Sequence, residues 1–164
     1  MRIYLIGMPG SGKSSVGKKL ASKIGYEFID LDNYIEKQAF MFVDEIFQNY
    51  GEKHFRKLEE EALKEIKNQD NIVVATGGGI VVNKSNKELM DGPCIYLNVN
   101  LSELSNRIIS SDIERPLLRT KSIDIIYAER KDLYDYFKDY EVLNDNLDNT
   151  INKILEIVNE NKNN

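Results

Sequence analysis

The chain has 164 residues, which suits one domain, and 41% of them are hydrophobic, which is enough for one core. An excess of 27 acidic over 22 basic residues gives a formal net charge of −5 and argues against nucleic acid or a membrane surface as a partner, because both favour a basic face. Since the single cysteine cannot form an internal disulfide and no run of roughly 18 apolar residues could cross a bilayer, we expect a cytoplasmic protein without a membrane anchor.

Short apolar runs alternate along the chain with longer amphipathic stretches, which is the pattern of a parallel sheet covered by helices. Strands are predicted at residues 3–6, 27–29, 72–75, 94–97 and 141–143. Helices are predicted at residues 13–24, 32–38, 43–50, 52–68, 101–109, 123–139 and 147–158, with a frayed tail at 159–164. Because no linker or break in composition divides the chain, residues 1–164 are expected to form a single α/β domain.

A glycine-rich segment at residues 7–14, Gly-Met-Pro-Gly-Ser-Gly-Lys-Ser, follows the first predicted strand and opens the first predicted helix. It matches the phosphate-loop pattern, in which glycines let backbone N–H groups point at phosphate oxygens and a helix N-terminus adds its dipole. Lys13 would reach the β- and γ-phosphates, and the Ser14 hydroxyl would be a Mg²⁺ ligand. The alternative is a strand–helix turn without a ligand. The residues expected to bind ATP are Gly10, Ser11, Gly12, Lys13, Ser14 and Ser15.

Two aspartates, Asp30 and Asp32, end the second predicted strand. Because side chains alternate along a strand, residues at i and i+2 are expected on one face, at the strand ends where ligands of a parallel sheet bind. One carboxylate is expected to hold Mg²⁺ through water, and the other to accept a proton from an attacking hydroxyl. The alternative is that Asp32 only caps the helix that follows.

Three consecutive glycines, Gly77, Gly78 and Gly79, follow the third predicted strand. Consecutive glycines cost backbone entropy, so they favour a place where a ligand approaches the main chain too closely for any Cβ. The alternative is a flexible hinge.

Together with Phe55-Arg56 on a predicted helix and Arg115-Pro116-Leu117-Leu118 further on, these motifs occur in an order that resembles the shikimate kinase family, over nearly the whole chain. The resemblance implies a three-layer phosphate-loop kinase fold, whose five-stranded parallel sheet has the strand order 2-3-1-4-5 and is flanked by helices. It also implies substrate-binding helices at about residues 32–68 and a lid at about residues 110–118.

The reaction that the resemblance implies is transfer of the γ-phosphoryl group of ATP to the 3-hydroxyl of shikimate, with Mg²⁺ as cofactor, in the biosynthesis of chorismate and the aromatic amino acids. A monomer is expected, because no exposed apolar stripe is evident. Two alternatives remain open. One is a kinase for another small acceptor such as gluconate, and the other is a non-catalytic nucleotide-binding regulator.

By the resemblance, Asp32 binds the ring hydroxyls of the acceptor and acts as the base, and Asp30 lies in the outer shell of the Mg²⁺. Arg56 and Arg130 would clamp the carboxylate of the acceptor, since a planar guanidinium can donate two parallel hydrogen bonds to it. Arg115 would contact ATP at the transferring phosphate. The expected catalytic residues are Lys13, Asp32 and Arg115. The backbone of Gly77, Gly78 and Gly79 is expected to contact the acceptor, Val43, Phe47 and Phe55 to line its pocket, and Glu59 to orient Arg56.

The chain departs from the family at several places, two of which concern the lid and the acceptor pocket. Between Arg107 and Arg115 it has no arginine, where many relatives carry one in the lid, so weaker ATP binding or weaker closure is expected. Phe40-Met41-Phe42 replaces a turn of small residues and is expected to place bulk beside the acceptor pocket.

Overall fold

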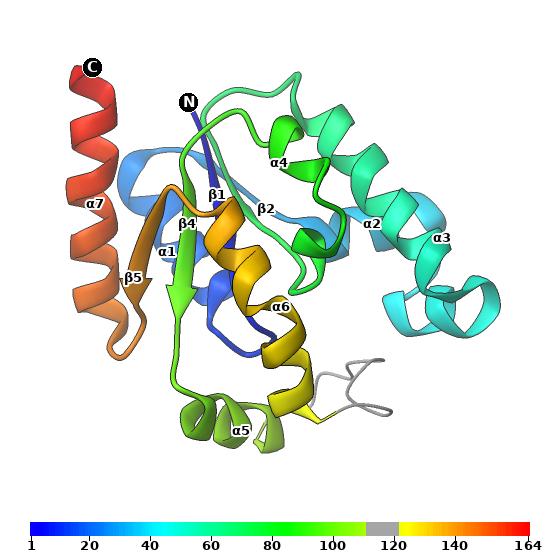
Figure 1. Cartoon of the computed structure of the whole chain (residues 1–164). Helices are drawn as coiled ribbons and strands as arrows, with labels where there is room; N and C mark the ends of the chain where they lie inside the picture. The colour runs from blue at the N-terminus through cyan, green and yellow to red at the C-terminus, as the bar shows by residue number, and fades with distance from the viewer. Residues whose placement is uncertain (111–121) are drawn as a thin grey trace.

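The structure, a computed structural model, describes residues 1–110 and 122–164, and within them five strands form one sheet (Figure 1). The strands are β1 (Arg2–Ile6), β2 (Glu27–Asp30), β3 (Ile72–Ala75), β4 (Cys94–Asn98) and β5 (Tyr140–Leu143). They pair in parallel in the order β2-β3-β1-β4-β5. The predicted fold and strand order are therefore confirmed, and the ends of each predicted strand shift by no more than one residue.

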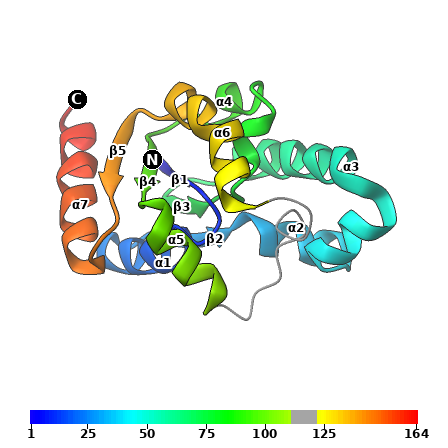
Figure 2. The same cartoon turned by 60° about the horizontal axis from the view of Figure 1, so that its bottom comes forward.

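Helices lie on both sides of this sheet, which gives the three layers that were expected. In the described residues they are α1 (Lys13–Ile24), α2 (Leu31–Ala39), α3 (Val43–Ile66), α4 (Asn86–Leu89), α5 (Leu101–Ile109), α6 (Ile123–Phe137) and α7 (Leu147–Asn163), with a 3₁₀ turn η1 (Ile80–Val82). Figures 1 and 2 both show α7 beside β5 and α3 at the opposite side of the molecule.

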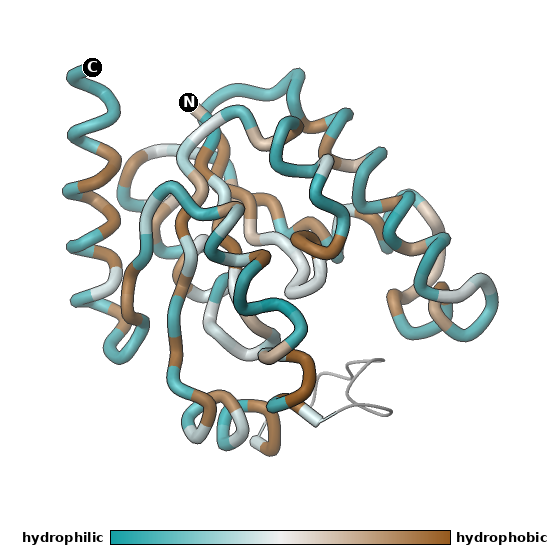
Figure 3. Tube along the Cα trace, viewed as in Figure 1, coloured by the Kyte–Doolittle hydropathy of each residue, from teal (hydrophilic) through white to brown (hydrophobic). Residues whose placement is uncertain are grey.

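The central strands are buried on both faces, because their alternating side chains enter two different cores. Along β1, Ile3 and Leu5 join a cluster with α1 and α7, whereas Tyr4 and Ile6 join a cluster with α2, α3 and α6. Figure 3 shows the result as hydrophobic colour on the strands and alternating colour along α7, as an amphipathic helix requires.

Three helical predictions differ from the structure. The helices predicted at 43–50 and 52–68 are two halves of α3, which is broken at Gly51 by a backbone conformation of φ 84 and ψ 172. Helix α7 continues to Asn163, so the tail predicted to fray after residue 158 is largely helical. Neither η1 nor α4 was predicted, because elements of three and four residues are too short to show a helical period.

The strands all finish at one edge of the sheet, which Figure 2 brings forward. The segment between β1 and α1, the start of α2, and the segment between β3 and η1 meet there, because parallel strands place their carboxyl ends together. In the described part of the chain no helix is both long and apolar enough to span a membrane.

Candidate active site

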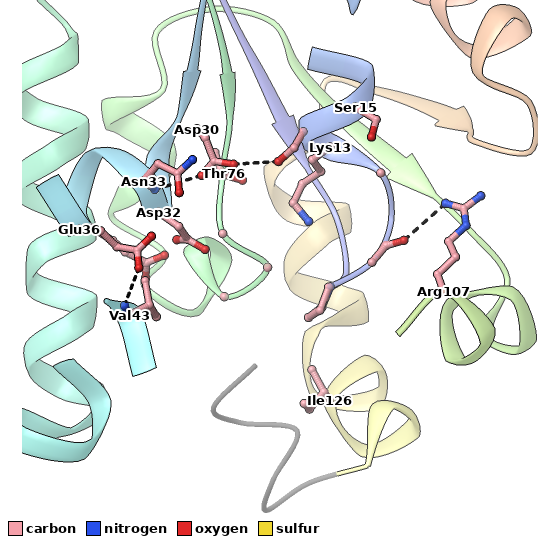
Figure 4. A pocket seen from close by; sticks show the side chains of 18 of the residues that line it. Lys13, Ser15, Asp30, Asp32, Asn33, Glu36, Val43, Thr76, Arg107 and Ile126 are labelled. Carbon is pink, nitrogen blue, oxygen red and sulfur yellow. Dashed lines mark hydrogen bonds between the residues drawn. The ribbon is translucent and has the colours of Figure 1, made fainter. Parts of the chain in front are cut away.

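A pocket of about 1040 Å³ opens at this carboxyl edge of the sheet. Its walls come from the 7–14 segment, the start of α2, α3, the glycine triplet and α6. Figure 4 shows Lys13 and Asp32 pointing into the same space from opposite sides. The volume is large enough for a nucleotide together with a small acceptor.

The phosphate-loop motif lies between β1 and α1, which is the context that the motif requires. Gly10 and Gly12 have positive φ values of 79 and 90, so glycine suits both positions. The Lys13 ammonium donates to the carbonyl oxygens of Gly7 and Met8, each at 2.9 Å, and to Ser11 Oγ at 3.3 Å. The lysine therefore lies over the loop, where it would meet bound phosphates.

Ser14 and Asp30 form a pair of oxygen ligands beside the loop. The Ser14 hydroxyl donates to Asp30 Oδ2 at 2.8 Å, and Asp30 Oδ1 accepts from the backbone N–H of Asn33 at 3.1 Å. Mg²⁺ prefers oxygen donors and takes few of them from the protein when phosphates and water supply the rest. The pair therefore fits the predicted metal site, although the described residues hold no group of three or more His, Cys, Asp or Glu that could bind a metal together.

Asp32 lies at the pocket, but on a different element from the predicted one. Strand β2 ends at Asp30 and α2 begins at Leu31, so the two aspartates do not share a strand face. Asp30, not Asp32, caps α2, which corrects the alternative role considered for Asp32. Asp32 lies in the first turn of α2 and lines the pocket.

The Asp32 carboxyl is partly buried among charged groups, several of them acids. Its Oδ1 is buried and has no hydrogen-bond partner among the described residues. Burial raises the pKa of Asp32 to about 7, Glu59 and Asp30 add to the rise, and the Lys13 charge opposes it. A carboxyl with a pKa near neutrality is suited to accept a proton at physiological pH.

Arg56 is held in place by two acids on its own helix. It donates to Glu59 at 2.6 Å and to Glu52 at 3.2 Å, and Glu59 is fully buried. Burial alone lowers the pKa of Arg56, but the two carboxylates more than offset it, so the guanidinium remains charged. The predicted orientation of Arg56 by Glu59 has a direct contact to support it, and Arg56 Nε has no partner in the described part of the chain.

The glycine triplet is packed against the charged groups of the pocket. A Cβ on Gly77 would lie 2.9 Å from Asp32 Oδ1, and one on Gly79 would lie 2.2 Å from Arg56 Nη2. A Cβ on Gly78 would lie 2.8 Å from Pro9 of the phosphate loop. Close approach of these protein groups accounts for the glycines, and the close approach of a ligand stays a prediction.

One side of the pocket is formed by an apolar wall and a second arginine. Phe47 and Phe55 lie 4.9 Å apart between ring centroids, and the Arg56 guanidinium lies 5.5 Å from the Phe55 ring. Arg130 of α6 is 5% exposed and lines the same pocket. Of the aromatic turn expected to add bulk, Phe42 lines the pocket, whereas Phe40 is 94% exposed.

Sequence reasoning missed Asn144 and the role of Arg107. The Asn144 amide donates to Ser11 O at 2.7 Å, and Arg107 donates to Asn144 O at 3.0 Å and to Gly10 O at 3.4 Å. Both side chains therefore support the phosphate loop. Asn144 directly follows β5, so the rule that ligands bind beyond strand carboxyl ends was the signal that could have found it.

Most of the predicted site residues lie together in this pocket. Those that line it are Gly10, Gly12, Lys13, Ser14, Ser15, Asp30, Asp32, Arg56, Gly77, Gly78, Gly79 and Arg130. Ser11, within the loop, is fully buried and does not line the pocket. Arg115 and all of the predicted lid except Ser110 lie outside the described residues.

Comparisons with known proteins agree with this geometry. The model of the shikimate kinase family matches residues 9–159. A shikimate kinase of Sulfurihydrogenibium sp. (strain YO3AOP1) is 42% identical over 136 residues, which cover 80% of this chain and 81% of that protein. A shikimate kinase of Clostridium botulinum (strain Alaska E43 / Type E3) is 38% identical and 96% of each chain is covered.

Solved structures are similar over almost the full length. The shikimate kinase from Acinetobacter baumannii in complex with shikimate has a TM-score of 0.90 and 31% identity, with 98% of this chain and 94% of that chain covered. The shikimate kinase from Aquifex aeolicus vf5 has a TM-score of 0.85 and 32% identity, with 99% and 98% covered.

Proposed function

Because the chain belongs to the shikimate kinase family, we propose that it transfers the γ-phosphoryl group of ATP to the 3-hydroxyl of shikimate, giving shikimate 3-phosphate and ADP in the biosynthesis of chorismate and the aromatic amino acids. One observation carries the proposal. A single pocket brings Lys13 of the phosphate loop together with the Asp32 carboxyl, and with the guanidinium groups of Arg56 and Arg130. An acceptor with ring hydroxyls and a carboxylate matches these groups.

On the ATP side, the chain supplies positive charge and oriented N–H groups. Lys13 now donates to loop carbonyls at 2.9 Å, and it can turn from them to the β- and γ-phosphate oxygens, where charge builds up during transfer. Ser14 and Asp30 would hold Mg²⁺, Ser14 directly and Asp30 through water, and the bound ion would neutralise charge on the phosphates. We include Arg115 in this set on sequence grounds, as the group that contacts the transferring phosphate.

On the acceptor side, Asp32 removes the proton from the attacking hydroxyl. As the hydroxyl oxygen forms its bond to the γ-phosphorus, the bond from that phosphorus to the bridging oxygen of ADP breaks, and the proton passes to Asp32. A pKa of about 7 leaves much of Asp32 deprotonated before the reaction and able to hold the proton after it.

Arg56 and Arg130 hold the acceptor through its carboxylate. Arg56 is fixed by Glu59 at 2.6 Å, so its guanidinium loses little freedom when the acceptor binds. This positioning keeps the reacting hydroxyl in line with the γ-phosphate, which accounts for a large part of catalysis in phosphoryl transfer.

The proposal also places the protein in the cytoplasm as a monomer that binds neither nucleic acid nor membranes. Its net charge of −5 supports the absence of a nucleic-acid partner. Sedimentation velocity would test the monomer directly.

The test of the function is Mg²⁺-dependent release of ADP from ATP, with shikimate, gluconate and a nucleoside monophosphate offered separately. Stimulation by shikimate alone is expected. Stimulation by gluconate instead would mean that the two arginines bind a different acidic polyol. Nucleotide binding without stimulation by any acceptor would point to the non-catalytic regulator.

A further inference from the structure

Tyr134 connects helix α6 to the glycine triplet. Its side chain is fully buried, and its hydroxyl donates to the carbonyl oxygen of Gly78 at 2.6 Å. Its ring stacks on Tyr96 of β4, with ring centroids 5.0 Å apart and an angle of 9° between the planes. The ring therefore has one packed position, which fixes where the hydroxyl points.

The carbonyl groups of the triplet show why this hydroxyl matters. Gly77 O accepts from the N–H of Ile80 at 3.2 Å, and Gly79 O accepts from the N–H of Val82 at 3.0 Å, so η1 satisfies the outer two. In the described part of the chain, the middle carbonyl of Gly78 accepts from Tyr134. Glycine places little restriction of its own on φ and ψ, so an external hydrogen bond has to orient this peptide.

The same hydroxyl also meets the second arginine. Arg130 lies one helical turn before Tyr134 on α6, and its guanidinium is near enough to the Tyr134 hydroxyl to lower the pKa of that group. Burial raises the pKa of Tyr134 to about 12, while Arg130 opposes the rise, so the phenol stays protonated and continues to donate to Gly78.

We propose that Tyr134 is a positioning residue for the acceptor. Its hydroxyl holds the Gly78 peptide and the Arg130 guanidinium in fixed positions relative to each other. The triplet lies close to Asp32 at Gly77 and to Arg56 at Gly79, where an added Cβ would collide with each side chain. The Tyr134 hydroxyl thus fixes the positions of Asp32, Arg56 and Arg130 relative to one another. This inference rests on the proposed function, because it assigns the acceptor to the same pocket.

Tyr134→Phe tests it, since the change removes the hydroxyl and keeps the stacked ring. The KM for shikimate is expected to rise about tenfold while the KM for ATP stays within about twofold, as for the loss of one buried hydrogen bond on the acceptor side. Tyr96→Phe is the matched control, because it makes the same chemical change on the other ring of the stack, and no hydrogen bond of the Tyr96 hydroxyl is found in the described residues. It is expected to leave both KM values unchanged.

A second measurement does not depend on the acceptor. Hydrogen–deuterium exchange of backbone amides at residues 76–82 is expected to be at least about fivefold faster in Tyr134→Phe than in Tyr96→Phe, because the Gly78 peptide loses its anchor. Exchange that matches the control would overturn the positioning role even if shikimate proved not to be the substrate. Faster exchange in an enzyme that shikimate does not stimulate would reject the proposed function and keep the anchor. An unchanged KM for shikimate in an active enzyme would reject the role in acceptor binding.

Discussion

At the scale of one side chain, Asp32, the proposed base, differs from Asp30 in its environment and not in residue type. Asp30 and Asp32 are two residues apart, yet their surroundings differ. Asp30 accepts hydrogen bonds from Ser14 and from the N-terminus of α2, whereas Asp32 Oδ1 has no such partner among the described residues. Hydrogen bonds stabilise a charged carboxylate and burial destabilises it, so the two acids suit different tasks.

The pH dependence of activity follows from this difference. The base must be deprotonated to accept a proton, so kcat/KM for shikimate is expected to rise about tenfold per pH unit below the Asp32 pKa of about 7 and to level off above it. Initial rates between pH 5.5 and 9, at saturating ATP and Mg²⁺, measure the profile. Asp32→Asn is expected to lose about a thousandfold in kcat above pH 7, and the difference from the wild type should shrink as the pH falls below 7. A flat wild-type profile would contradict the assignment.

Arg56 is predicted to need its guanidinium shape as well as its charge. Arg56→Lys keeps a cation beside the buried Glu59, but an ammonium cannot donate two parallel bonds to a carboxylate, so the KM for shikimate should rise about tenfold or more. The KM for ATP should not change. Lys53→Arg, an exposed exchange on the same helix, is the control. Equal effects of both exchanges on the KM for shikimate would count against carboxylate binding.

At the scale of single elements, the break in α3 is the feature that shapes the acceptor side. Phe47 precedes Gly51 and Arg56 follows it, and the break turns the two halves so that both side chains line the pocket. The helical period of each half was visible in the sequence, but the direction of the break was not. It depends on the conformation of one glycine, which has no side chain to restrict it.

Gly51→Ala is expected to destabilise the fold by about 2 kcal/mol, because φ 84 with ψ 172 is accessible essentially to glycine alone. Apart from the two chain neighbours, no atom of the described residues lies within 4 Å of the added Cβ, so the cost is in the backbone. Gly25→Ala is the matched comparison, since its Cβ is equally unobstructed but its φ of 71 and ψ of 31 lie in the ordinary left-handed region. Urea unfolding should show the smaller loss for Gly25→Ala. Equal losses would mean that α3 straightens to absorb the change.

At the scale of the whole molecule, the nucleotide site is supported from the far end of the chain. The Asn144 amide donates to Ser11 O at 2.7 Å, and the Thr150 hydroxyl donates to Asn144 Oδ1 at 2.9 Å. A Cβ on Gly12 would lie 2.5 Å from Asn144 Nδ2, so the loop and this side chain are in close contact. The turn between β5 and α7 therefore packs against the phosphate loop, although it lies more than a hundred residues from it in the chain.

Asn144→Ala is accordingly expected to raise the KM for ATP about fivefold to tenfold and to leave the KM for shikimate near the wild-type value, because a buried hydrogen bond to the loop is lost. Asn149→Ala, an exposed change on α7, serves as the control. Steady-state kinetics with each substrate varied in turn measure both values. A rise confined to the KM for shikimate would show that the loop does not depend on Asn144.

The features that could be predicted from the sequence were those that depend on residues close together in the chain. The phosphate loop could be predicted because its residues are consecutive in the chain. It lies between a strand and a helix, and each of these two elements follows from a local sequence pattern. The strand positions were readable because buried parallel strands are short apolar runs. The strand order came from the resemblance to a family, and the described sheet confirms it.

The tertiary structure alone decided which groups meet and in what environment. The sequence located Asp32, but enclosure near Glu59, which lies on another helix, set its pKa. The sequence located the glycine triplet, but the contact of Gly78 with Tyr134, 56 residues away, is formed by packing of α6 against the sheet. Such contacts leave no local pattern, because burial and desolvation depend on what the rest of the chain places alongside. Sequence therefore determined the phosphate-binding chemistry, and packing decided the geometry and the acidity of the acceptor site.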